Sequence, residues 1–180
     1  MNILLETERL IIRPLEVGDS EFIHRLLNTP SWLQFIGDRN VRTLADAEKY
    51  LVNGPLKSYK EHGFGPWLVC LRPDSCPIGI CGLFKREYLD SPDLGFAFLP
   101  EFEGRGYAAE SVAVILAYSE EQLALGKIVA FTETSNARSV RLLERSGFRY
   151  TEMIKPPKED HELMLFTIDL ETRGIDTAKP

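Results

Sequence analysis

The chain has 180 residues, of which 44% are hydrophobic and 27% are charged, and its formal net charge is −6. These values are typical of one globular domain and argue against a strongly basic surface, so we expect no direct contact with nucleic acid. Residues 1–6 do not open a signal peptide and no stretch approaches the roughly 20 apolar residues of a membrane span, so we expect a cytoplasmic protein without a membrane partner.

The cysteines are Cys70, Cys76 and Cys81, and an odd number argues against a closed disulfide framework. They form no Cys-x-x-Cys pair, and the histidines lie far apart in the sequence, so the ligand spacing of known zinc sites is missing. We therefore expect no metal.

In the first half of the chain, the spacing of apolar residues predicts two helices between an opening strand and a block of three strands. Asp19 is a plausible N-cap for the first helix and Thr43 for the second, which Asn53-Gly54-Pro55 breaks or kinks. The expected elements are a strand at 9–13, helices after residues 19 and 43, a loop at 30–42, and strands at 66–72, 78–86 and 93–99.

The second half predicts two helices that alternate with strands. Gly126 is expected to cap the first of these helices and Gly147 to end the second. The expected elements are a helix from about 107 to 123, a strand at 127–133, a helix at 136–146 and strands at 148–153 and 162–170.

The crossover from residue 93 to residue 133 requires its two strands to be nearly parallel, whereas the hairpins require antiparallel pairing. We therefore predict an α/β (α+β) fold with a mixed, mostly antiparallel central sheet of about seven strands flanked by helices. Residues 1–171 are expected to form a single domain, and residues 172–180 a polar tail.

The segment between the strand at 93–99 and the following helix is rich in glycine. Gly104 and Gly106 can take φ values that other residues avoid, and the first turn of a helix leaves N–H groups unpaired beside a partial positive charge. A pyrophosphate would satisfy both, and Arg105 could add a charge contact. The alternative is a tight strand-to-helix connection. A dinucleotide fold is disfavoured, because Ala109 stands at the third glycine position and antiparallel strands precede the loop.

Three stretches together resemble the GNAT superfamily of N-acetyltransferases, most of all the branch that includes the ribosomal-protein N-terminal acetyltransferases. These are residues 93–111 (DLGFAFLPEFEGRGYAAES), 136–148 (NARSVRLLERSGF) and 78–83 (IGICGL). The similarity runs from about residue 7 to residue 170. It implies a GNAT-like acyl-CoA N-acyltransferase fold, an N-acetyltransferase activity and acetyl-CoA as cosubstrate.

The resemblance also implies how acetyl-CoA is held. The family's pyrophosphate motif reads from Glu101 to Gly106, where Glu101 replaces a Gln or Arg and is expected to weaken affinity. Asn136 would bond the pantetheine arm, although it also suits a helix N-cap. Arg145 could reach the 3′-phosphate or stay solvated. The implied coenzyme-binding residues are Phe98, Leu99, Gly104, Arg105, Gly106, Tyr107, Ala108, Ala109, Asn136, Ser139 and Arg145.

For catalysis the resemblance implies direct attack of an amine within a ternary complex. The oxyanion donor would be a backbone N–H at about Leu99. Leu143 occupies the position of a frequent catalytic Tyr, so Ser139 is the candidate donor to the leaving sulfur, with a helix-surface serine as the alternative. The candidate bases are Glu87, Asp93 and Glu133, with a chain of waters as the alternative.

The acceptor is expected to be a primary amine, either a protein N-terminus or a small molecule such as an amino acid, polyamine or aminoglycoside. Trp32, Phe35 and Tyr59 are candidate walls of its site, although core packing is the commoner role for each of them taken singly. A different class of function, a catalytically silent acetyl-CoA-binding sensor or interaction protein, stays open because of Leu143. The sequence favours neither a monomer nor a homodimer.

Overall fold

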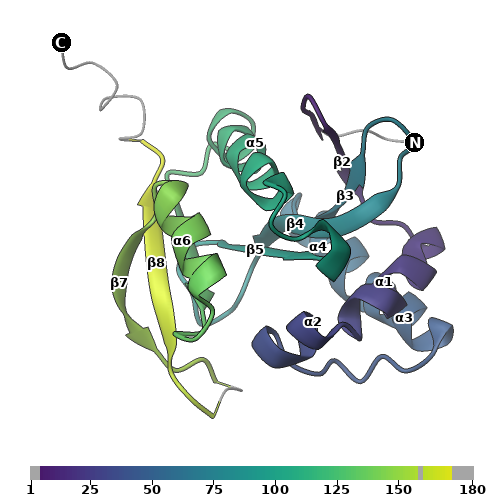
Figure 1. Ribbon diagram of the computed structural model, residues 1–180. Helices are drawn as coiled ribbons and strands as arrows, with labels where there is room; N and C mark the ends of the chain where they lie inside the picture. Colours follow the sequence, from purple (N-terminus) through teal and green to yellow (C-terminus); the bar gives the residue numbers. More distant parts are fainter. Residues whose placement is uncertain (1–4, 158–159, 172–180) are drawn as a thin grey trace.

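The computed structural model describes residues 5–157 and 160–171, and within them the central element is an eight-stranded sheet (Figure 1). The strand order is β1-β2-β3-β4-β5-β6-β8-β7. The strands are β1 (Leu5–Glu6), β2 (Leu10–Pro14), β3 (Pro66–Leu71), β4 (Pro77–Phe84), β5 (Asp93–Phe98), β6 (Lys127–Thr132), β7 (Arg149–Ile154) and β8 (Leu163–Asp169). The predicted mixed, mostly antiparallel sheet is confirmed. The additional strand is β1, whose two residues are too short for an alternating pattern. The predicted tail at 172–180 lies outside the described residues.

The helices match the apolar patterns except in two places. They are α1 (Ser20–Leu27), α2 (Pro30–Phe35), α3 (Leu44–Leu51), α4 (Lys57–His62), α5 (Tyr107–Glu121) and α6 (Ala137–Arg145). The expectation of a loop at 30–42 was wrong, because Thr29 caps α2 by accepting the Trp32 N–H and Pro30 occupies the first helical position. Gly126 does not cap α5, which ends at Glu121; the Gly126 carbonyl accepts the Leu170 N–H at 2.8 Å.

Thr43 caps α3 as predicted, and the kink at Asn53-Gly54-Pro55 is a π-helical segment, Val52–Leu56, that joins α3 to α4. The apolar faces of the helices bury two separate cores against the sheet. Val112, Ile115 and Leu116 of α5 pack in the core that also contains Leu143 of α6. The other core holds the buried faces of α1, α2 and α3, with the side chains of Ile23, Leu26, Leu27, Trp32, Ala47 and Leu51.

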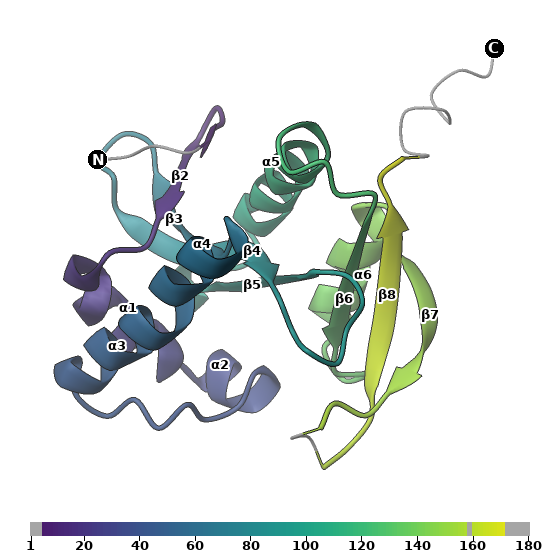
Figure 2. The same cartoon turned by 180° about the vertical axis from the view of Figure 1, so that it is seen from behind.

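The single parallel pair in the sheet, β5 with β6, is joined only at its start. Asp93 lies opposite Val129, whose N–H donates to the Pro92 carbonyl at 3.0 Å. Beyond that point β5 stays paired with β4 on one side and β6 with β8 on the other. Figure 2 shows β5 crossing the middle of the molecule while β6 and β8 run along one side of it. The predicted parallel crossover from β5 to β6 is confirmed. The two strands separate immediately beyond the paired residues Asp93 and Val129.

Candidate active site

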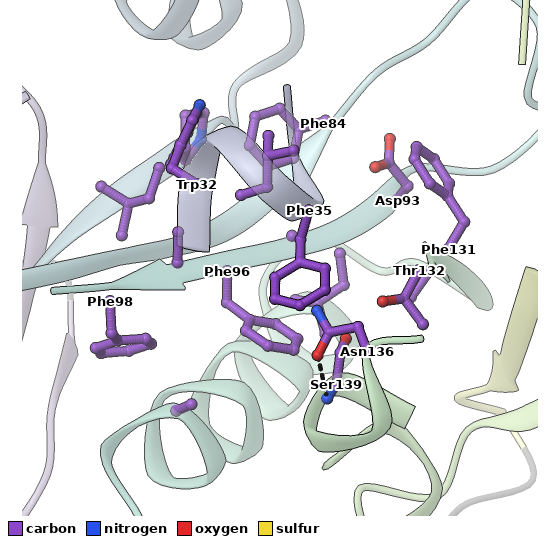
Figure 3. A pocket seen from close by; sticks show the side chains of 18 of the residues that line it. Trp32, Phe35, Phe84, Asp93, Phe96, Phe98, Phe131, Thr132, Asn136 and Ser139 are labelled. Carbon is purple, nitrogen blue, oxygen red and sulfur yellow. Dashed lines mark hydrogen bonds between the residues drawn. The ribbon is translucent and has the colours of Figure 1, made fainter. Parts of the chain in front are cut away.

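A cavity of about 1680 Å³ opens where β5 and β6 part (Figure 3). Its walls come from β5, β6, the N-terminal ends of α5 and α6, and α2 on the opposite side. Pockets for a single drug-sized ligand are usually about 300–1,000 Å³, so this cavity has room for two substrates at once.

The edge of β5 that faces the cavity is defined by its pairing with β4. The Leu99 N–H donates to the Ile78 carbonyl at 2.9 Å, on the β4 side. Because successive residues of a strand direct their backbone groups to opposite edges, the N–H groups of Phe96 and Phe98 face the opening toward β6. Leu99 is 1% exposed and does not line the cavity, so the sequence placed the oxyanion donor on the wrong edge of the strand.

The glycine-rich loop presents unpaired backbone donors to the cavity. Gly104 and Gly106 have φ values of 73° and 83°, and the first helical bond of α5 runs from the Glu110 N–H to the Gly106 carbonyl. The N–H groups of residues 107–109 therefore lack helical partners, and Tyr107, Ala108 and Ala109 all line the cavity. This backbone and the dipole of α5 together fit a phosphate group.

Arg105 does not line the cavity; its guanidinium lies over the Phe102 ring, 6.0 Å from the centroid. Another arginine, Arg9, contacts the back of the loop. Its Nη1 donates to the Arg105 carbonyl at 3.1 Å and its Nε to Glu110 Oε2 at 2.7 Å, while the guanidinium lies 4.7 Å from the Tyr107 ring centroid. The loop is thus fixed from outside the cavity by a residue about 100 positions earlier in the chain.

At the start of α6, Asn136 and Ser139 face the cavity together (Figure 3). Asn136 is the N-cap, and its Oδ1 accepts the Ser139 N–H at 3.1 Å. The Ser146 hydroxyl, on the same helix, donates to the Leu142 carbonyl at 2.8 Å. The Ser139 hydroxyl has no such partner in the described part of the chain, so it is available to a ligand.

Farther along α6, arginines line the same cavity. Arg145 is exposed there, as is Arg141, and Arg138 pairs with Glu103 of the glycine-rich loop at 2.9 Å. Leu143 is 1% exposed in the core, so its position offers no hydroxyl.

The three candidate bases differ in their surroundings. Asp93 lines the cavity, is 3% exposed and accepts a hydrogen bond from Arg86 Nε at 2.9 Å. Burial raises the pKa of Asp93 to about 6, against the opposing charge of Arg86. Glu133 also lines the cavity but pairs with His161. Glu87 is exposed and does not line it. Asp93 is therefore the carboxylate best suited to exchange a proton near neutral pH.

Aromatic side chains form the wall opposite α6. Trp32 and Phe35 of α2 both line the cavity, and Figure 3 shows Phe35 pointing toward Asn136. Tyr59 does not line the cavity, because its hydroxyl donates to the Pro66 carbonyl and accepts the Leu15 N–H at 3.1 Å. Sequence reasoning also missed Phe84 and Phe131, which line the cavity near Asp93.

Residues 9–149 match the family model described as an acetyltransferase (GNAT) domain. The chain belongs to the GNAT acetyltransferase family. Membership supports acetyl-CoA-dependent N-acetylation, and with it the sequence-based prediction of an N-acetyltransferase is confirmed.

Named GNAT relatives act on different amines. The spermidine N(1)-acetyltransferase of Vibrio cholerae is 28% identical over 141 residues, which cover 78% of this chain and 79% of the relative. A solved spermidine N-acetyltransferase from the same species, in complex with CoA and spermine, has a TM-score of 0.76 at 24% identity and covers 92% of this chain and 98% of that one. The solved ribosomal-protein-S5-alanine acetyltransferase of Vibrio fischeri has a TM-score of 0.79 at 17% identity. The match covers 99% of this chain and 100% of that one. Similarity at these levels establishes the shared fold.

Within residues 5–157 and 160–171, no three His, Cys, Asp or Glu side chains gather where they could hold a metal ion. Among the same residues, no helix has the length and apolar character needed to cross a membrane.

Replacing Arg9 with alanine is expected to raise the KM for acetyl-CoA by about tenfold with little change in kcat. The variant loses the hydrogen bonds to the Arg105 carbonyl of the loop and to Glu110 at the start of α5, which frees the backbone donors from their alignment. Kinetics and calorimetric titration with acetyl-CoA would measure this. Arg149→Ala, which removes an exposed arginine on β7, is the matched control. Unchanged affinity in Arg9→Ala would show that the loop holds its shape without Arg9.

Proposed function

We propose that the protein transfers the acetyl group of acetyl-CoA directly to a primary amine bound between α2 and β5. The observation that carries this is the open edge of β5, whose free amides face one cavity shared by the α5 N-terminus, Ser139 and Asp93. The relatives named above as acting on spermidine and on a ribosomal-protein alanine support a primary amine as the acceptor.

The coenzyme would lie along the cavity from the α5 N-terminus to Asp93. The N–H groups of Tyr107, Ala108 and Ala109 would hold the pyrophosphate, and Arg145 would approach the 3′-phosphate. The Phe98 backbone would pair with the pantetheine arm as a neighbouring strand would, with Asn136 beside it.

Three groups of the chain would then serve the chemistry. The Phe96 N–H, on the open edge and three residues from Asp93, would donate to the thioester oxygen as negative charge develops. The Asp93 carboxylate would take the proton of the attacking amine, and the Ser139 hydroxyl would donate to the departing sulfur. All three positions line the same cavity.

The proposal is tested by calorimetric titration with acetyl-CoA, followed by an amine screen with thiol-release detection. Binding that needs the pyrophosphate, judged against coenzyme A and adenosine 3′,5′-bisphosphate, together with turnover of a primary amine, is expected. Binding without turnover of any amine would instead support a silent coenzyme-binding protein. No binding at millimolar coenzyme would overturn the assignment of the loop.

Replacing Ser139 with alanine is expected to lower kcat by about 10- to 100-fold, because the leaving thiolate then lacks its donor. The effect should fall on kcat rather than on the KM for acetyl-CoA, which steady-state kinetics would separate. Ser146→Ala is the matched control, since its hydroxyl is already bonded to the Leu142 carbonyl on the same helix. A Ser139→Ala variant with undiminished turnover would remove Ser139 from the mechanism.

A further inference from the structure

The cavity carries a charge opposite to that of the whole protein. Seven Lys and Arg side chains line it, against four Asp and Glu side chains, which gives a formal charge of +3 in a chain whose net charge is −6. An acidic protein that gathers cations in one cavity favours anionic ligands there.

Part of this charge lies on α6 and belongs to the coenzyme half of the site. Arg138, Arg141 and Arg145 project from that helix and suit the phosphates of the coenzyme. The remaining lining cations are Arg39, Lys57, Lys85 and Arg86, which lie on the other elements around the cavity. The coenzyme half therefore does not account for them.

The carboxylates in that other half already have side-chain partners. Glu61 pairs with Lys57 at 3.7 Å, Asp93 with Arg86 at 2.9 Å, and Glu133 with His161. Arg39 and Lys85 differ, since within the described residues their hydrogen bonds reach only backbone carbonyls, those of Ile36 at 3.4 Å and Leu89 at 3.2 Å. Neither has a carboxylate partner among residues 5–157 and 160–171.

A tyrosine lines the cavity within range of the charges of two of these cations. Tyr50 of α3 lines the cavity, and burial raises the pKa of its hydroxyl while the charges of Arg39 and Arg86 act against that rise. The hydroxyl therefore stays protonated and can donate a hydrogen bond beside the two guanidinium groups. Arg39, Tyr50 and Lys85 all line the cavity, and we name these three residues the acceptor anion cluster.

We infer that the acceptor is a small amine that also carries a carboxylate, bound by the acceptor anion cluster. The inference rests on the proposed function and specifies its substrate class. The amine would face Asp93, while the apolar part of the molecule would pack against Phe35 and Phe84. A guanidinium and a protonated phenol that line one cavity suit a carboxylate, because both can donate to its oxygens and the guanidinium adds a positive charge.

This surface disfavours a polyamine. A polyamine would bring several positive charges toward Arg39 and Lys85, and the lining carboxylates of that half are already paired with other side chains. Like charges placed opposite one another reject a ligand as effectively as attractive contacts select one. The acceptor class of the spermidine-acetylating relative is thus not the one that this cavity fits.

The test compares acceptors that differ only in the carboxylate. At saturating acetyl-CoA, thiol release is measured with a panel of amino acids including phenylalanine, with the amide of each, and with spermidine. We expect kcat/KM for the best amino acid to exceed that of its amide by about tenfold or more. Arg39→Gln should lower the value for the amino acid by about tenfold and leave the amide unchanged. Lys60→Gln, an exposed cation on α4 that does not line the cavity, is the matched control.

The possible failures are distinguishable. Turnover of spermidine or of the amides at rates equal to or above those of the amino acids overturns the inference and leaves the proposed function standing. If Arg39→Gln lowers kcat/KM equally for an amino acid and for its amide, the inference is also overturned, because the cluster then does not bind the carboxylate. No turnover of any amine, in protein that binds acetyl-CoA, overturns both.

Discussion

Replacing Asp93 with asparagine is expected to lower kcat by about 10²- to 10⁴-fold at neutral pH, the range typical of losing a general base. Asparagine keeps the shape of the side chain but cannot take a proton. Asp93 lies where β5 and β6 part, and it lines the cavity from a position that is 3% exposed. Steady-state kinetics on an identified amine would measure the loss.

The raised pKa of Asp93 determines in which direction the rate should change with pH. A base acts only when ionised, and the pKa of Asp93 is raised by burial to about 6. The wild-type rate should therefore rise with pH through about 6 and level off above it, and this acidic limb should be absent in Asp93→Asn. A variant that retains both the rate and the limb would show that another group takes the proton.

Two controls separate Asp93 from the other carboxylates. Glu87→Gln alters an exposed side chain that does not line the cavity and should leave kcat unchanged. Glu133→Gln removes the partner of His161 within the cavity and should leave the limb at about pH 6 in place. If Glu133→Gln abolishes the limb while Asp93→Asn does not, their roles are exchanged.

Local sequence signals predicted most of the fold because they act within a few residues. The Thr43 cap and the apolar faces of α1 and α5 each depend on neighbouring positions. The helix α2 was missed because its six residues are too few for a convincing period, although Thr29-Pro30 signalled its start. Gly126 failed as a cap because α5 ends earlier and Ala124 takes the left-handed conformation, with φ 49°.

The difference between local signals and tertiary packing also explains which residues of the site could be predicted. The glycine-rich loop and the start of α6 are contiguous motifs, and most of the residues predicted from them line the cavity, with Arg105 the exception. Which edge of β5 an amide faces depends on its register with β4, so Leu99 could not be distinguished from Phe98 without the Leu99–Ile78 bond. Arg9 behind the loop, and Arg39 beside Tyr50, are brought to their places by tertiary packing that leaves no local pattern.

Asp19 is the N-cap residue of α1, as the sequence predicted, but the role of its side chain was not anticipated. This side chain makes no cap bond. Instead Asp19 Oδ2 and Oδ1 accept from Arg13 Nη1 at 2.8 Å and Nη2 at 2.7 Å, and Oδ2 also accepts the Glu16 N–H at 2.8 Å. Both side chains are only 10% exposed. The pair therefore ties β2 to the start of α1 in a setting with little water.

Replacing Asp19 with alanine is expected to lower the free energy of unfolding by about 3–5 kcal/mol, because it leaves the Arg13 guanidinium buried without its counter-charge. Arg13 Nε already lacks a hydrogen-bond partner among the described residues, so the loss of Asp19 would leave further buried N–H groups of the guanidinium without an acceptor. Urea unfolding followed by circular dichroism would measure the change.

Asp38→Ala provides the matched control, since it breaks an ion pair with Arg42 in which the two side chains are about half exposed. Such pairs contribute little because water and salt screen them, so the urea midpoint should stay where it is in the wild type. Adding Arg13→Met to Asp19→Ala should recover part of the lost stability, because the double variant has no buried unpaired charge. If Asp19→Ala unfolds at the same urea concentration as Asp38→Ala, then water reaches the Arg13 guanidinium and solvates it. In that case the packing of α1 on β2, rather than the ion pair, stabilises the junction between these two elements.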